Sequence, residues 1–261
     1  MSYTDLHVHS TYCDGKSSIE EIILSAIEKD MKCIGISSHS YTDFDLSYCL
    51  KKERYNEYIS EVKALKEKYK DKITVLCGIE QDVFSDASTD GFDYVIGSVH
   101  YFRTSEGYLP IDSSKEEFKL ALENHFKNDL KALIRNYFTG VRLLPHRVKP
   151  DIIGHFNLIS KYNEGFKIFD ENDPYFIKEY TDTIDSLLPY QIPFEVNTGA
   201  ISRGYRSFPY PNEEMIKYIT ACGGKLVFSS DSHHAKNLCF QFDEWKEYFD
   251  KLGIKIENFE K

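Results

Sequence analysis

Short apolar runs alternate with amphipathic stretches along most of this 261-residue chain, which is the pattern of a parallel α/β fold. Strands are predicted in seven segments: 3–9, 32–40, 73–82, 92–102, 148–158, 192–199 and 225–234. Helices are predicted between most of them: 17–31, 51–70, 115–138, 174–188 and 212–224. Seven strands that mostly precede helices favour a β/α barrel over an open doubly wound sheet, although periodicity alone is compatible with both.

The predicted helix ends carry their own signals. Ser17 and Glu20 have the spacing of a capping box at the start of the first helix, and Pro174 occupies a favoured first-turn position. The last helix is expected to begin at Asn212 and to stop at a glycine. The apolar residues of the first helix fall on one face: Ile19, Ile22, Ile23, Ala26 and Ile27.

The chain shows no linker, low-complexity segment or strong internal repeat, so we expect a single domain over residues 1–261. It also lacks a GxGxxG or Walker loop, which disfavours nucleotide-binding variants of an α/β fold.

Charge and composition narrow the possible partners. The formal net charge of −10 disfavours a nucleic acid as partner, since phosphate-binding surfaces are usually basic, but it leaves a small phosphorylated substrate open. No apolar run approaches the roughly 18 residues of a membrane span, and no signal peptide is recognisable, so we expect a cytoplasmic protein that binds no membrane. The six cysteines form no CxxC pair and are expected to be free thiols.

Ionisable side chains recur at the carboxyl ends of the predicted strands. They are His7, His9 and the nearby Asp14, then His39, Glu80, His100, His155, Glu195, Asp231 and His233. In a β/α barrel these strand ends surround one pocket, so residues more than 200 positions apart would converge there. His7 and His9 alternate by two, and their side chains therefore point to the same face of the strand.

These side chains suggest a metal site. A lone histidine at a strand end is more often a hydrogen-bonded structural residue than a ligand, but unpaired buried charges are too costly to accumulate in one place. Without Glu195, the set contains nine candidate ligands, which is too many for one ion and generous for two. Nine residues suit three ions if Glu80 bridges two of them. Histidine with carboxylate fits Zn²⁺, Mn²⁺ or Fe²⁺ and fits Ca²⁺ poorly.

Other histidines fall outside this pattern. His125 lies within a predicted helix, His146 follows Pro145 in a turn-like stretch, and His234 should point away from its neighbour His233. We expect all three to lie at the surface or outside the set of ligands.

The ordered motifs resemble the PHP (polymerase and histidinol phosphatase) superfamily, and most closely its monofunctional histidinol-phosphate phosphatases. They are DLHVHSTYCDG, GISSHS, GIEQD, GSVH, IIGHFNLI, FEVNTGAISRGYRSFPYP and FSSDSHH, with GYLPIDSSKEEF after the fourth. The resemblance runs from about residue 4 to residue 234 and implies a distorted (β/α)7 TIM-like barrel with up to three divalent metal ions.

The resemblance also implies how the ligands divide among the ions. The first ion would be held by His7, His9, Glu80 and Asp231; the second by Glu80, His100 and His155; the third by Asp14, His39 and His233. Two departures concern the third ion. Asp14 stands where some relatives have histidine, and Ser37-Ser38 precede His39 where a TDH or SDH motif is common.

The activity that the resemblance implies is hydrolysis of L-histidinol phosphate to L-histidinol and inorganic phosphate, in histidine biosynthesis. A hydroxide shared by two metals would attack the phosphoryl group, with Glu80, Asp231 and Arg203 as the catalytic set. Arg203 is the candidate for binding phosphate, because a guanidinium can bond two oxygens at once, and Lys161 is a second candidate.

Two other functions remain open at this point. The first is a PHP phosphoesterase that acts on another phosphomonoester or on a nucleotide. The second is a metal-storage or regulatory protein without catalysis, which would have no need of an arginine beside the metals.

Overall fold

The computed structural model describes residues 3–259, and its centre is a sheet of seven parallel strands. In spatial order these are β1 (Thr4–Asp5), β2 (Cys33–Ile36), β3 (Thr74–Asp82), β4 (Tyr94–Ser98), β7 (Ile152–Ile153), β8 (Phe194–Asn197) and β9 (Leu226–Ser229). The first and last strands meet again just beyond their carboxyl ends. There the His9 amide donates to the Ser232 carbonyl at 2.8 Å, and the Ser232 amide donates to the His7 carbonyl at 3.1 Å.

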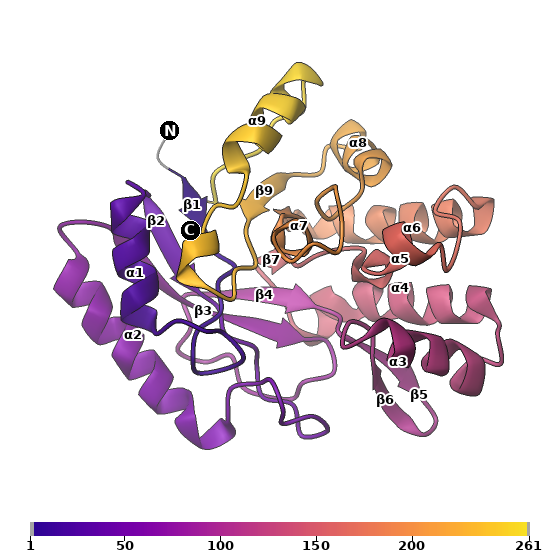
Figure 1. The fold of residues 1–261 in the computed structure, drawn as a ribbon, viewed down its shortest axis with the longest axis horizontal. Helices are drawn as coiled ribbons and strands as arrows, with labels where there is room; N and C mark the ends of the chain where they lie inside the picture. The colour runs from indigo at the N-terminus through magenta and orange to yellow at the C-terminus, as the bar shows by residue number, and fades with distance from the viewer. Residues whose placement is uncertain (1–2, 260–261) are drawn as a thin grey trace.

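These two bonds make the sheet a nearly closed barrel, as predicted, and exclude the open doubly wound alternative. Helices surround it, and the longer ones are α1 (Ile19–Glu28), α2 (Tyr55–Tyr69), α4 (Leu130–Arg147), α6 (Pro174–Leu187), α8 (Glu213–Ala221) and α9 (Phe242–Lys251). The shorter ones are α3 (Lys115–Leu120), α5 (Asn163–Phe166) and α7 (Gly199–Ser202). In Figure 1, α1 and α2 cover one flank while α4 and α6 pack together on the other.

Single turns complete the helical segments. Four are 3₁₀ turns, η1 (Lys52–Arg54), η3 (Leu158–Ser160), η4 (Leu188–Tyr190) and η5 (Ala235–Asn237), and η2 (Ala121–His125) is a π turn. Within the described part of the chain, no helix is both long and apolar enough to cross a membrane.

The capping box of α1 lies one residue later than the sequence spacing predicts. Ser18 is the N-cap, and its hydroxyl and backbone amide form the reciprocal pair of bonds with Glu21. Ser17 is instead buried, and its hydroxyl accepts a hydrogen bond from the Ala235 amide at 3.1 Å. The predicted Ser17–Glu20 pair was wrong, because the Ser17 hydroxyl bonds instead to the amide of Ala235, more than 200 residues later in the chain.

The predicted strand 92–102 is two strands that belong to different sheets. β4 ends at Ser98, and β5 (Tyr101–Thr104) pairs antiparallel with β6 (Gly107–Pro110) outside the barrel. The chain leaves the barrel where the His100 amide donates to the Asp82 carboxylate at 2.9 Å instead of continuing the ladder. A side chain thus ends the strand in the middle of an apolar run.

The predicted helix 115–138 is also interrupted. α3 and η2 end before Lys127 and Asn128, whose φ angles of 52° and 61° are left-handed and cannot continue a right-handed helix. Asp129 then caps a new helix, α4, which extends to Arg147. His146 consequently lies in a helix, and the turn-like prediction for it was wrong.

The floor of the barrel is a buried cluster that contains Leu6, Cys33, Tyr94, Ile96, Ile152 and Val227. Tyr94 is fully buried across Gly35 and Gly78, where an added Cβ would lie within 2.1–2.2 Å of its ring or hydroxyl. Its hydroxyl donates to the Leu6 carbonyl, one residue before His7. The floor therefore supports the backbone that carries the first histidines of the site.

Candidate metal centre

Glu80, at the carboxyl end of β3, is fully buried at the centre of the predicted site. Its Oε2 atom lies 2.7 Å from His39 Nδ1, 3.2 Å from His7 Nε2 and 3.6 Å from His9 Nε2. The parallel strands β1, β2 and β3 end side by side here, so their histidines approach the same carboxylate oxygen.

The other oxygen of Glu80 faces a second pair of imidazoles. Oε1 lies 2.9 Å from His155 Nε2 and 3.2 Å from His100 Nε2. Asp82 contacts the other ring nitrogen of His100, and its carboxylate lies 3.2 Å from Nδ1. The two oxygens of one carboxylate thus face two different groups of nitrogens, which is the arrangement that a bridging ligand requires.

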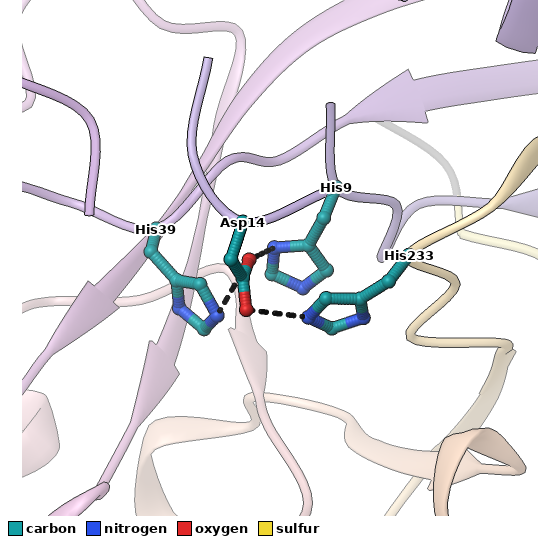
Figure 2. Close-up of side chains that lie close together, drawn as sticks. All are labelled: His9, Asp14, His39 and His233. Carbon is teal, nitrogen blue, oxygen red and sulfur yellow. Dashed lines mark ion pairs between the residues drawn. The ribbon is translucent and has the colours of Figure 1, made fainter. Parts of the chain in front are cut away.

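A further cluster consists of Asp14 and three imidazoles, shown in Figure 2. Asp14 Oδ2 lies 3.2 Å from His233 Nε2, and Oδ1 lies 3.7 Å from His39 Nε2 and 4.0 Å from His9 Nδ1. The three imidazoles surround the carboxylate from several sides, and His9 and His39 follow strands β1 and β2 in the chain. The structure therefore places the three predicted ligands of the third ion together, with His9 beside them.

Asp231 connects this cluster of imidazoles and carboxylates to Arg203. One carboxylate oxygen lies 3.2 Å from His9 Nε2, and the other accepts a bond from Arg203 Nη2 at 3.0 Å. Arg203 Nη1 also donates to the Asp231 carbonyl at 2.8 Å and lies 3.2 Å from His233 Nδ1. Asp231 has a φ of 47°, so a non-glycine residue adopts a left-handed conformation at this point of the site.

A pocket of 310 Å³ opens over these residues. Both predicted phosphate-binding residues, Arg203 and Lys161, line it. The Lys161 ammonium donates to the Asp112 carbonyl at 2.8 Å and pairs with the Asp112 carboxylate at 3.1 Å. The lining of the pocket also includes the ligand candidates His100, His155 and Asp231, so the pocket connects the polar cluster to solvent.

The electrostatics of the cluster reflect this crowding. Burial raises the pKa of Glu80, but the neighbouring imidazoles outweigh it and hold the pKa well below 4.5. Burial likewise raises the pKa of Asp231, and the Arg203 guanidinium and His7 bring it well below 3.8. Both carboxylates are therefore ionised near neutral pH and available as ligands.

Several polar atoms of the cluster are buried without a hydrogen-bond partner among the described residues: His7 Nε2, His9 Nε2, Asp14 Oδ1 and Glu80 Oε2. Leaving such atoms unsatisfied is costly, and divalent cations would satisfy them. The donors are imidazole nitrogens and carboxylate oxygens, which suit Zn²⁺, Mn²⁺ or Fe²⁺. The residues present therefore fit a centre for divalent metal ions.

Sequence reasoning missed the carboxylates that contact the ligand candidates and Lys161. Asp82 carried a signal, because it lies two residues after Glu80 on the same face of β3. Asp112 lies in a loop and carried none. Glu195 stood out as an acid at a strand end but received no role, and it contacts His7 directly.

The remaining histidines lie apart from this cluster. His125 pairs with Glu106, His146 lies 3.1 Å from the Tyr190 hydroxyl, and His234 caps η5.

The sequence of this chain is similar to a known domain family and to several named proteins. A family model of the PHP domain matches residues 5–199. A Schizosaccharomyces pombe protein named "Probable histidinol-phosphatase" is 28% identical over 274 residues, covering 95% of this chain and 86% of the relative. The histidinol-phosphatase of Bacillus subtilis is 23% identical over 273 residues, covering 95% and 99%.

A solved structure shares the fold. The histidinol phosphate phosphatase of Lactococcus lactis, complexed with zinc, L-histidinol and phosphate, superposes with a TM-score of 0.74 at 18% identity. The superposition covers 99% of this chain and 97% of that one.

Proposed function

This chain belongs to the PHP domain family, and from that premise we propose that it is a metal-dependent phosphatase that hydrolyses L-histidinol phosphate to L-histidinol and inorganic phosphate. The observation that carries the proposal is the position of Glu80, whose two oxygens face separate groups of imidazoles beneath a pocket that contains Arg203 and Lys161. Relatives that match nearly the whole chain are named for this activity.

The division of the ligands among three ions is the one that the family resemblance implies, and the short distances around Glu80, Asp231 and Asp14 support it. His7, His9, Glu80 and Asp231 would hold one ion; Glu80, His100 and His155 a second; Asp14, His39 and His233 a third. Bound divalent ions would lower the pKa of a water molecule and offset negative charge on the phosphoryl group. The whole of residues 1–261 would act as one domain.

Arg203 and Lys161 would bind the phosphoryl oxygens. A guanidinium has five N–H donors, and the contacts of Arg203 with Asp231 and His233 leave donors free. An ammonium has three, of which Lys161 gives two to Asp112. Their anchoring partners hold both cations at the pocket before a substrate arrives, so little conformational entropy is lost on binding.

The test is metal-dependent phosphate release from L-histidinol phosphate. The protein is stripped of metal with a chelator and then reconstituted with Zn²⁺ or Mn²⁺. We expect activity only after reconstitution, and we expect Glu80→Gln to abolish it because the amide cannot serve as a bridging anion. Glu179→Gln is the matched control, since Glu179 pairs with Arg142 on the outer helices.

Activity that survives both metal removal and the Glu80→Gln change would overturn the proposal. Tight metal binding without turnover of any phosphomonoester would instead indicate metal storage or regulation.

A further inference from the structure

Glu195 is a fully buried carboxylate beneath the metal cluster, in the middle of β8. Its Oε1 atom lies 2.5 Å from His7 Nδ1, accepts a bond from Asn197 Nδ2 at 2.8 Å and contacts the Ser229 hydroxyl. Its Oε2 atom accepts the backbone amide of His155 at 2.8 Å. Both oxygens therefore act as acceptors, and the donors come from four segments of the barrel.

The contact with His7 selects the tautomer of that imidazole. A carboxylate can only accept, so Nδ1 must carry the proton that lies between them. An imidazole that binds a metal ion has to be neutral, and in the neutral ring Nε2 is then left with its lone pair, 3.2 Å from Glu80 Oε2 and without a hydrogen-bond partner among the described residues. This is the nitrogen that the proposed first ion requires.

The contact with His155 acts on the opposite side of Glu80. The bond from the His155 amide fixes the backbone where β7 ends, and the imidazole of the same residue places Nε2 2.9 Å from Glu80 Oε1. One carboxylate thus holds a ligand candidate from each of the two groups that face Glu80.

We propose that Glu195 is a positioning residue that sets the tautomer of His7 and couples the two halves of the metal centre. It does so by accepting from the His7 ring with one oxygen and from the His155 backbone with the other. The proposal rests on the metal centre of the proposed function and not on the identity of the substrate.

Glutamine at position 195 can keep only one of the two contacts, either with the His7 ring or with the His155 amide. If its carbonyl oxygen accepts from His7, its NH₂ group faces the His155 amide, donor against donor. If the side chain is flipped, the NH₂ group faces His7 Nδ1, and the ring proton must move to Nε2, where it blocks the ligand position. Either arrangement removes one of the two contacts, whereas an ionised carboxylate satisfies both.

The experiment compares Glu195→Gln with wild type in zinc affinity and in ¹H–¹⁵N spectra of histidine-labelled protein. We expect Glu195→Gln to weaken zinc binding by about 10–100-fold, the range typical of residues that orient metal ligands. In the spectra we expect a change in the ring nitrogens of His7 or in the backbone amide of His155. Glu195→Asp retains the charge, so we expect it to restore part of the affinity.

Asp82→Asn is the matched control, because Asp82 is also a buried carboxylate but contacts only His100 among the ligand candidates of the described chain. We expect it to change the His100 signals and to leave those of His7 unchanged.

Two results would overturn the role of Glu195 alone: wild-type zinc affinity in Glu195→Gln, or His7 signals that change equally in Asp82→Asn. A wild-type protein that binds no divalent ion would overturn the metal centre itself. Because no readout uses substrate, loss of the histidinol phosphate proposal would leave the test intact. If Glu195→Gln does not fold, Glu195→Asp carries the test, and unchanged affinity and spectra in it would refute the role.

Discussion

A methyl group added at Gly35 should destabilise the barrel, above all through its contact with the Tyr94 hydroxyl. The new Cβ would lie 2.1 Å from the Tyr94 hydroxyl oxygen, 2.8 Å from Cζ and 2.9 Å from Leu6 Cδ2. Overpacking of this kind costs about 1–3 kcal/mol, and the fully buried ring has little room to move. At about 2–4 °C per kcal/mol, Gly35→Ala should lower the melting temperature by several degrees.

Combining this change with Tyr94→Phe tests the cause. Tyr94→Phe alone loses the hydrogen bond to the Leu6 carbonyl, which is worth about 1 kcal/mol, but it also removes the atom closest to the new methyl group. The double variant should therefore be more stable than the sum of the two single effects predicts, by about 1 kcal/mol.

Urea unfolding of the four proteins measures this coupling. Gly165→Ala is the control, because among the described residues no atom beyond its chain neighbours and its own helix backbone lies within 4 Å of the added Cβ, and it should be neutral or slightly stabilising. Additivity of the two single effects to within about 0.5 kcal/mol would refute the reasoning, since it would mean that Gly35 and Tyr94 act independently.

Three further predictions concern the helix cap, the pocket and the thiols. Ser18→Ala should lower the free energy of unfolding by about 1 kcal/mol in urea titrations, because it removes the N-cap of α1; an unchanged midpoint would contradict this. Arg203→Lys should lower kcat/KM about 100-fold at unchanged metal content, because an ammonium cannot bond both Asp231 and a phosphoryl oxygen in the same geometry; wild-type phosphate release would argue against this role. Burial raises the pKa of Cys33 to about 11, so at pH 8 its thiol stays protonated, and iodoacetamide should modify the exposed Cys222 first; peptide mass spectrometry that finds equal rates would contradict this.

The positions of the candidate ligands could be predicted from the sequence because they depend on strand order. His7, His39 and Glu80 each lie near the carboxyl end of a predicted strand, and parallel strands of a barrel bring such ends to one rim. The PHP family and the barrel fold follow from the same motifs, and the comparisons confirm them.

The sequence predictions that failed, and the contacts that were missed, depend on other features of the chain. The break at Lys127 and Asn128 lacks glycine or proline, and its local signals, an asparagine that tolerates the left-handed region and the N-cap Asp129, stand inside a pattern that otherwise reads as helical. Ser17 does not cap α1, because its hydroxyl accepts from the Ala235 amide, which is far from it in the chain. The contact of Glu195 with His7 joins opposite parts of the sequence. Such pairings are determined by tertiary contacts, which a periodic pattern does not encode.

The most direct test of the central claim is the ratio of kcat/KM for L-histidinol phosphate to that for other phosphomonoesters, measured with the zinc- or manganese-loaded protein. The panel includes glycerol phosphate, p-nitrophenyl phosphate and a nucleoside monophosphate. The account predicts a preference for L-histidinol phosphate of about 100-fold or more, because its pocket must bind the amino alcohol as well as the phosphate. Equal or better hydrolysis of another ester would contradict it.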